Sequence, residues 1–287
     1  MWPANPPRPT ATELATLAVS TTVKQDLVAK VWRALPSLEE NSAHFQGLVH
    51  GGSAERCLSA NYSTGEVTGK DLQWLYRNHV ADSTDGAARD LYHEIKIRGP
   101  IDGVCPYCNH RDVGTVDHFV PKSKIPALSI EPWNLVPACM ACNKTMLDAF
   151  SPEPGEQYLH PYSRPFPISP EMRWLRAEVV PGPPTVVRFR AEPEGSCDPL
   201  LAQRIVYEFD GLRLAELYSK LSIKKLNAAR SRFIRDSFTA DTIREHLQEL
   251  ARTAEGAGAN EWEAVLYYTL LASDWYVNGG YLQEDAG

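Results

Sequence analysis

The sequence predicts an α+β fold that is mainly helical, with a small strand–strand–helix module near its centre and a β-hairpin after it. Three observations lead to this prediction. Two Cys-x-x-Cys pairs enclose a stretch rich in β-branched residues between residues 105 and 142. Two further β-rich runs flank a Pro-Gly-Pro-Pro turn. Apolar residues at helical spacing account for much of the remaining chain.

The first hundred residues are predicted to be helical. One helical face is indicated by five apolar residues, Leu27, Val28, Val31, Trp32 and Leu35. Two shorter patterns indicate further helices, at Leu72, Leu75, Tyr76 and at Leu91, Tyr92, Ile95. Residues 41–69 are rich in Gly, Ser and Asn, which predicts a long connection with its hinge at Gly51-Gly52.

Cys105, Cys108, Cys139 and Cys142 have the spacing of a structural zinc site. Four thiolates at about 2.3 Å complete a tetrahedral shell, so this zinc would hold the fold and keep no open position for a substrate. A Cys-Pro-Tyr-Cys motif also occurs in dithiol redox proteins, but there a helix follows directly, whereas here Gly114 and β-branched residues follow. Disulfides are a further alternative, although such pairs suit zinc better in a reducing compartment.

The segment between the cysteine pairs predicts two strands and a helix. Residues 113–119 are β-branched and apolar around the pair Asp117-His118, which indicates a strand ending at that pair. Asn134 begins the returning strand, and residues 139–150 are predicted as a short helix that carries Asn143. Three polar residues are therefore expected beside the zinc site.

Asp117-His118, Asn134-Leu135 and Cys142-Asn143, in this order between paired cysteines, resemble the HNH nuclease motif in its ββα-metal fold, in the zinc-clamped variety. The third position departs from the commoner His, and Asn143 offers a neutral oxygen that a hard cation accepts. Neighbouring segments also resemble the stand-alone HNH proteins that accompany ATPases in prokaryotic anti-phage systems of the Septu and retron-linked kinds. These segments are residues 88–92, 122–139 and 159–162.

The resemblance implies a metal-dependent endonuclease, and each catalytic residue has an expected role. His118 would take the proton of the attacking water, because an imidazole with a pKa near 6.5 is largely neutral at pH 7. Asp117 and Asn143 would bind the catalytic Mg²⁺ or Mn²⁺, which needs few protein oxygens. Asn134 would brace the loop through backbone hydrogen bonds. Alternatively, Asp117-His118 is a turn pair and Asn143 only caps a helix.

Four further residues are expected near a nucleic acid backbone. Lys122, Lys124 and Lys144 flank the predicted ligands, so their charges would contact phosphate without reading sequence. The alternative for each is a solvated loop lysine. His160 lies with Tyr162 in a Pro-rich loop that would fold back over the site, and a structural role is an equal alternative.

The C-terminal third is predicted to start with a hairpin, over residues 174–180 and 185–190, and to continue as helices starting near Thr242 and Asn260. Residues 204–235 hold eight basic and three acidic residues, and the apolar residues of this segment fall near helical spacing, although the whole chain has a net charge of −7. This basic helix is expected to guide a substrate strand. A solvated face or a surface for an acidic partner are the alternatives.

The sequence as a whole predicts a central zinc-stapled ββα-metal (HNH) module at 99–168, a helical region at 1–98 before it, and the hairpin with helices at 169–287 after it. We expect an endonuclease acting on DNA rather than RNA, in anti-phage defence with a partner ATPase. A silent zinc module that binds nucleic acid or scaffolds a complex is the alternative. No signal peptide or membrane span is indicated, so a cytoplasmic location is expected.

Overall fold

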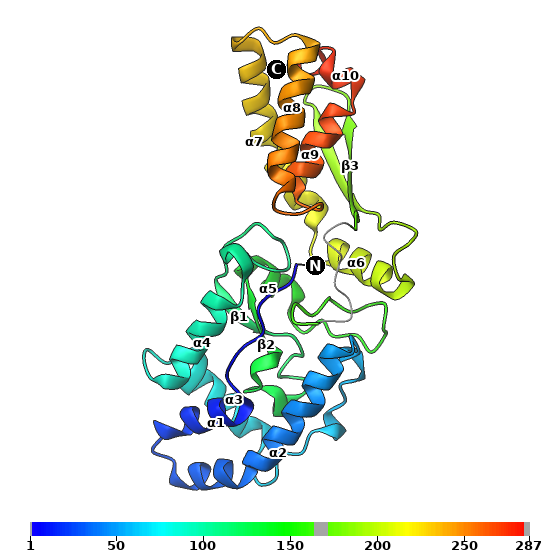
Figure 1. Cartoon of the computed structure of the whole chain (residues 1–287). Helices are drawn as coiled ribbons and strands as arrows, with labels where there is room; N and C mark the ends of the chain where they lie inside the picture. Colours follow the sequence, from blue (N-terminus) through cyan, green and yellow to red (C-terminus); the bar gives the residue numbers. More distant parts are fainter. Residues whose placement is uncertain (1, 164–171, 284–287) are drawn as a thin grey trace. The chain divides into compact units, whose positions relative to one another are not determined.

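The computed structural model describes residues 2–163 and 172–283 (Figure 1). The chain divides into two compact units, residues 1–167 and 168–287. The fold is mixed α+β and mostly helical, as the sequence predicts. The boundary predicted after residue 168 lies outside the described residues.

The N-terminal unit begins with helices whose starts are set by local capping. They are α1 (Ala11–Ser20), α2 (Gln25–His50), α3 (Gly69–Leu75), the π-helical turn η3 (Tyr76–Ala81) and α4 (Ala87–Arg98). Thr10 and Thr68 precede α1 and α3, and each accepts a backbone hydrogen bond while an acidic residue three positions later accepts one in return. These capping boxes satisfy amide groups that a helix start leaves without partners.

Helix α2 is longer than predicted. Residues 41–50 belong to it, so the connection runs only from Gly51 to Thr68 and contains the short 3₁₀ turns η1 (Ala54–Arg56) and η2 (Ser59–Asn61). The prediction gave too much weight to Gly, Ser and Asn, whereas Phe45 and Val49 are fully buried and continue the apolar face of the helix. Trp32, expected on that face, is instead 54% exposed.

The central module has the predicted order of strand, strand and helix. β1 (Thr115–His118) and β2 (Leu135–Ala138) pair antiparallel, with Asp117 opposite Val136 and His118 opposite Leu135. Short 3₁₀ turns lie before and between them, at η4 (Ile101–Gly103), η5 (Pro126–Leu128) and η6 (Pro132–Asn134). Helix α5 (Met140–Met146) ends four residues before the predicted end, because Leu147 turns into a left-handed conformation (φ 43°) and is exposed.

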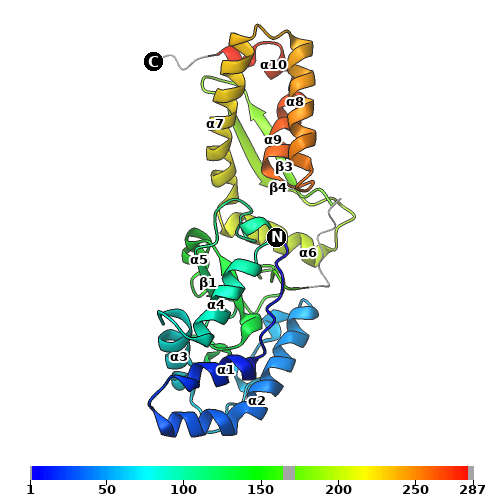
Figure 2. The same cartoon turned by 60° about the vertical axis from the view of Figure 1, so that its left-hand side comes forward.

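The helices of the first hundred residues and the module share one hydrophobic core. Helix α4 runs along the β1–β2 hairpin (Figures 1 and 2). Val116, Ile130 and Leu135 of the module are buried in the same cluster as Leu14, Val31, Leu72, Leu75, Val80 and Ile95 of the helices. The module is therefore supported by the region before it.

The Pro-rich start of the chain is also attached to the module. The backbone amides of Trp2 and Ala4 donate hydrogen bonds to the carbonyl oxygens of Pro106 and Pro161, at 3.0 and 3.1 Å. The Asn5 amide donates to Gly99 at 2.7 Å. These bonds link the first residues to the first cysteine pair and to the segment after α5.

The C-terminal unit is a hairpin packed against helices, and its hairpin confirms the prediction. Its elements are β3 (Leu175–Val180), β4 (Val186–Ala191), α6 (Pro199–Gly211), α7 (Leu214–Arg235), α8 (Ala240–Glu255), α9 (Trp262–Leu271), α10 (Asp274–Val277) and η7 (Gly280–Leu282). Helix α7 packs on β4 and α9 on β3 (Figure 2). Trp174, Phe189, Phe209, Tyr218 and Trp262 form its aromatic centre.

Both helices predicted to start near Thr242 and Asn260 are present, but neither is capped by the predicted residue. Helix α8 begins after Thr239, whose side chain accepts from the Thr242 amide, so the cap lies three residues before the predicted one. Asn260 does not open α9. Its Oδ1 accepts from the amides of Trp174 and Leu175, at 2.8 and 3.0 Å, and its Nδ2 donates to the Met172 carbonyl. The residue ties the hairpin to the helices, a contact between distant parts of the sequence.

Candidate active site and metal centre

The four cysteines meet at one buried point. The Sγ atoms of Cys105, Cys108, Cys139 and Cys142 all lie within 4.8 Å of one another, and the Cys108–Cys139 distance is 4.0 Å. A tetrahedral zinc with sulfurs at about 2.3 Å would place them about 3.8 Å apart. The donor set and its spacing fit zinc, and all four side chains are buried.

Local backbone geometry aims the sulfurs at this point. Asn109 adopts a left-handed conformation (φ 43°), and its amide donates to the Cys105 carbonyl at 2.8 Å, which closes the first turn. In the second turn Cys139 is the N-cap of α5, and its Sγ accepts from the Cys142 amide at 3.3 Å. Such a bond stabilises a thiolate, the form that binds zinc.

Asp117 and Asn143 face each other across the module. Asp117 lies near the end of β1 and Asn143 in the middle of α5. The end of the Asn143 amide lies 3.1 and 3.2 Å from the two Asp117 carboxylate oxygens, and with its nitrogen turned toward them the amide donates to both. The helix cap is Cys139, so the alternative that Asn143 serves as a cap is excluded.

These two side chains fit a divalent cation. With the amide oxygen of Asn143 turned toward Asp117, oxygens meet at 3.1–3.2 Å. Neighbouring ligands of an octahedral Mg²⁺ at 2.0–2.1 Å lie about 2.9 Å apart. Burial raises the pKa of Asp117 to about 7, because the carboxylate has lost part of its hydration. A bound cation would compensate for this loss.

His118 is held in one tautomer by the backbone. Its Nε2 lies 2.9 Å from the Ser129 carbonyl oxygen, which can only accept, so Nε2 carries the proton. The lone pair is then on Nδ1, the nitrogen available to accept a proton. Burial lowers the pKa of His118 to about 3, so the imidazole is neutral at pH 7. The fixed tautomer meets the geometric requirement of a general base, whereas burial makes the imidazole a weaker base than a free histidine.

Asn134 holds the loop between the two strands and is completely buried. Its Oδ1 accepts from the Val120 amide at 2.7 Å, while its Nδ2 donates to the carbonyls of Val120 and Leu128 at 3.0 and 3.1 Å. The same loop supplies Ser129, the partner of His118. Asn134 therefore supports the base indirectly through the loop.

Comparison with known proteins agrees with this geometry. The model of the HNH endonuclease family matches residues 105–146. Protein ea31 of Escherichia phage lambda is 26% identical over 233 residues, which cover 75% of this chain and 76% of protein ea31. No solved structure matches the chain. The HNH domain thus begins at the first zinc cysteine and ends with α5.

The three lysines predicted to contact phosphate differ in their exposure and in their contacts. Lys122 is half-buried, acts electrostatically on Asp117 and His118, and has its Nζ 5.5 Å from the centre of the Tyr76 ring. The Nζ of Lys124 donates to the Phe150 carbonyl at 3.0 Å, which ties the loop after β1 to the segment after α5. Lys144 is exposed, one residue after Asn143. Phosphate contacts by these lysines stay a prediction.

His160 attaches the segment after α5 to the HNH domain. It is buried, its Nε2 donates to the Trp133 carbonyl at 3.1 Å, and its Nδ1 accepts from the Tyr162 amide at 3.2 Å. The hydroxyl of Tyr162 donates to the Leu135 carbonyl at 3.0 Å. Because both ring nitrogens have backbone partners, this geometry favours the structural alternative, and contact of His160 with phosphate stays a prediction.

The sequence did not indicate which side chains from outside the HNH domain contact β1 and the loop after it. The Tyr76 ring lies edge-on to the His118 ring, with centres 4.4 Å apart, and the Tyr92 hydroxyl accepts from the Val116 amide at 3.2 Å. Gln73 donates to the Lys122 carbonyl at 2.6 Å. These residues come from α3, η3 and α4, and although Tyr76 and Tyr92 belong to predicted helical patterns, no local pattern indicates that they contact β1. A π-helical turn such as η3 often occurs at functional sites.

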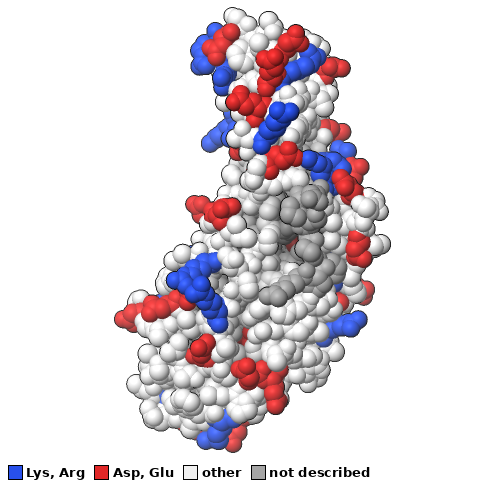
Figure 3. Space-filling view, in the orientation of Figure 1, with Lys and Arg blue, Asp and Glu red and all other residues white. Residues whose placement is uncertain are grey.

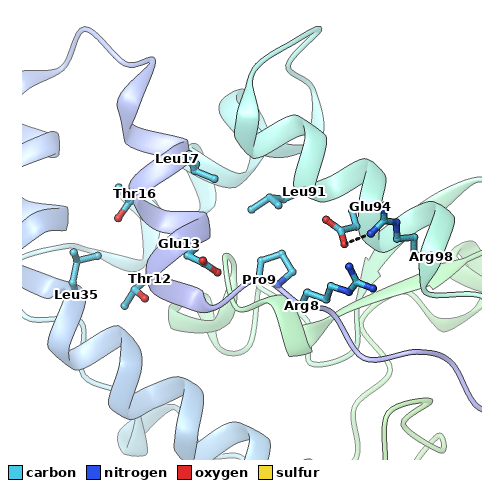
Figure 4. A pocket seen from close by; sticks show the side chains of 10 residues that line it. All are labelled: Arg8, Pro9, Thr12, Glu13, Thr16, Leu17, Leu35, Leu91, Glu94 and Arg98. Atoms are coloured by element: carbon cyan, nitrogen blue, oxygen red, sulfur yellow. Dashed lines mark hydrogen bonds and ion pairs between the residues drawn. The ribbon is translucent and has the colours of Figure 1, made fainter.

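A pocket of about 740 Å³ lies elsewhere in the unit, between α1, α2 and α4. Figure 4 shows Arg8, Glu94 and Arg98 gathered at one end and two threonines with two leucines, Thr12, Thr16, Leu17 and Leu35, toward the other. Its two arginines are balanced by two glutamates, and its lining contains neither His118 nor the zinc cysteines. On the face shown in Figure 3, basic and acidic side chains of the described residues are interspersed. Any positive electrostatic field that attracts a nucleic acid must therefore come from local groups of basic side chains.

Glu131 predicts a pH dependence of stability. It is 2% exposed, its Oε1 accepts from the Trp133 amide, and burial raises its pKa from 4.5 to about 7. Between pH 4.5 and pH 7 the folded state therefore holds more protons than the unfolded state. The contribution of Glu131 to the unfolding free energy is complete below pH 4.5, and roughly 3 kcal/mol of it is lost as the pH rises to 7. We expect Glu131→Gln to remove this part of the difference in unfolding free energy between pH 5 and pH 8.

The control for Glu131 is Glu40→Gln, an exposed glutamate on α2. Denaturant unfolding of the three proteins at both pH values measures the effect, and comparison with the parent cancels other titrating groups. An equal pH dependence of the parent and Glu131→Gln would contradict the prediction.

Proposed function

We propose that the chain is a metal-dependent HNH endonuclease that hydrolyses phosphodiester bonds in nucleic acid, with DNA favoured over RNA. The observation that carries this proposal is the facing pair Asp117 and Asn143 beside a neutral His118 whose Nε2 is tied to Ser129. The HNH match over residues 105–146 supports it.

The residues of the site divide the reaction between them. A bound Mg²⁺ or Mn²⁺ would neutralise charge on the phosphate and on the departing oxygen. Asp117 and Asn143 would hold this ion, while Nδ1 of His118 would accept the proton of the attacking water. Asn134 keeps the loop of Ser129 in place. Lys122, Lys124 and Lys144 would steady the nucleic acid backbone, whereas His160, whose two ring nitrogens bond to the protein backbone, would support the site structurally.

We place this nuclease in the cytoplasm, in anti-phage defence, beside a partner ATPase. The ATPase and the defence role follow from the resemblance to stand-alone HNH proteins of such systems. The similarity to a protein of phage lambda is consistent with a setting in phage–host conflict. No helix within residues 2–163 and 172–283 combines the length and the apolar character that crossing a membrane requires.

The experiment that tests the nuclease uses purified zinc-loaded protein with supercoiled plasmid and, separately, with total tRNA. Each substrate is incubated with EDTA, Mg²⁺ or Mn²⁺. We expect cutting of plasmid that requires added divalent ion. If neither substrate is cut while zinc is bound and the fold is intact, alone or with the ATPase, the chain is a silent module that binds nucleic acid or scaffolds a complex.

Substitutions at the facing pair test the catalytic ion. We expect Asp117→Asn and Asn143→Ala to raise the Mg²⁺ concentration for half-maximal cutting by at least about tenfold, because each removes an oxygen ligand or its charge. Asn143→Asp, the matched control, keeps an oxygen at the same position and should need no more Mg²⁺ than the parent. Unchanged Mg²⁺ dependence in Asp117→Asn would contradict the assignment.

A further inference from the structure

A pocket lined by basic residues lies in the C-terminal unit. A pocket of about 550 Å³ is formed by one face of α7, the start of β4 and the last described helical turns. Its lining is Pro184, Thr185, Val186, Ser219, Lys220, Ile223, Leu226, Asn227, Arg230, Tyr276, Tyr281 and Gln283. Two of these residues are cationic and none is acidic. The pocket in Figure 4, in contrast, has balanced charges.

The cations of this pocket are suited to bind an anion. Lys220 and Arg230 lie on the same face of α7, nearly three turns apart, with Asn227 between them. Lys220 is exposed and makes no ion pair within the described part of the chain. Elsewhere on α7, Lys225 is paired with Glu263 and Arg235 with Asp236. The charge of Lys220 is therefore not neutralised by the acids of its own helix, and Lys220 belongs to the lining of this pocket.

A buried hydroxyl of the pocket lacks a partner. Tyr276 is 1% exposed, and its hydroxyl has no hydrogen-bond partner among the described residues. A buried polar group without a partner is unfavourable and uncommon in native proteins. A ligand in the pocket would supply the missing bond. Ile223 (52% exposed) and Val186 (37% exposed) offer apolar surface beside it.

We propose that this pocket binds a short stretch of a single-stranded nucleic acid, with its phosphates at Lys220 and Arg230 and a base against Ile223 and Val186. Tyr276 and Asn227 then provide hydrogen bonds. Proteins bind single strands without reading their sequence by combining positive charge with side chains against which the bases pack, most often aromatic ones. The preference for an anion comes from the pocket itself, whereas the choice of nucleic acid rests on the proposed function. The pocket gives the acidic chain a local site for its substrate.

Binding is measured on the full-length His118→Ala protein without added divalent ion, so that no cutting occurs. The probe is a fluorescent single-stranded DNA or RNA of about 12 nucleotides. We expect Lys220→Glu to weaken binding roughly tenfold at low salt and to reduce the salt slope by about 0.7. Lys224→Glu is the matched control, because it makes the same change on the same helix outside the pocket lining, and it should weaken binding less than about twofold.

Tyr276→Phe separates ligand binding from folding. It removes only a hydroxyl that has no hydrogen-bond partner within residues 2–163 and 172–283, so the melting temperature should stay equal or rise. Binding of the strand should weaken about three- to tenfold, as expected for one lost hydrogen bond. A structural role of the hydroxyl would instead lower the melting temperature and leave binding unchanged.

Three outcomes overturn the proposal. The first is equal weakening by Lys220→Glu and Lys224→Glu, which would indicate diffuse charge attraction. The second is unchanged binding in both Lys220→Glu and Tyr276→Phe. The third is binding of AMP or inorganic phosphate at the pocket with none of the strand. Cutting of plasmid by the parent protein is scored separately, so a failure of the nuclease and a failure of this pocket are told apart.

Discussion

His118→Ala is expected to lower the rate of metal-dependent cutting by at least about 100-fold, because a positioned general base contributes a factor of this size or more. The structure makes the reason specific. The Ser129 carbonyl fixes the proton on Nε2, so Nδ1 alone can take the proton of water. Single-turnover cutting of plasmid at saturating Mg²⁺ measures the effect. A variant that cuts as fast as the parent would show that His118 is not the base.

His118→Ala will also cost stability. The side chain is buried, bonds to Ser129, and packs against the Tyr76 ring, so its loss should lower the unfolding free energy by about 2 kcal/mol. His160→Ala is the matched control, since His160 is equally buried and donates from Nε2 to a backbone carbonyl. The control should lose similar stability, yet retain most of its cutting when assayed well below its melting temperature.

Cys139→Ser is expected to release zinc and to unfold the whole N-terminal unit. Structural zinc contributes apparent binding free energies of about 10–16 kcal/mol, and this energy is available only in the folded state. Val116, Ile130 and Leu135 of the module are buried in one cluster with the preceding helices. Loss of the module therefore exposes the core of α1 to α4 as well.

Metal analysis and circular dichroism measure this result. Cys139→Ser should contain less zinc and lose the helical signal of the N-terminal unit, while the separate unit at 168–287 keeps its own helices. Cys57→Ser is the matched control: Cys57 is buried, lies outside the zinc cluster, and bonds to the Tyr62 hydroxyl, a bond that serine can keep. Full zinc content in Cys139→Ser would refute the four-cysteine site.

Local signals were sufficient for much of the HNH domain. Zinc ligands must come in closely spaced pairs, so Cys105-x-x-Cys108 and Cys139-x-x-Cys142 indicate the metal without any tertiary information. Strand periodicity located β1 and β2, and the order of Asp117, His118 and Asn143 indicated which elements carry them. The structure confirms these elements. The catalytic roles of the residues stay predictions.

The predicted helix boundaries were wrong where contacts with distant residues outweighed the local amino-acid composition. Residues 41–50 contain polar residues and Gly47, yet Phe45 and Val49 are buried, so the helix continues. Asn260 has the chemistry of a helix cap, but its amide is used by the hairpin far away in the sequence. Intrinsic preferences of single residues are small, and tertiary packing readily overrides them.

The sequence by itself determined the zinc site, the order of strand, strand and helix, and the polar residues offered at its centre, because these depend on spacing within short segments. Only the tertiary structure decided which nitrogen of His118 is free, which loop Asn134 holds, and which rings support β1. It also placed Tyr276, whose buried hydroxyl has no partner among the described residues, in the lining of a basic pocket. These properties arise from contacts between residues that are remote in the chain, and local periodicity carries no information about them.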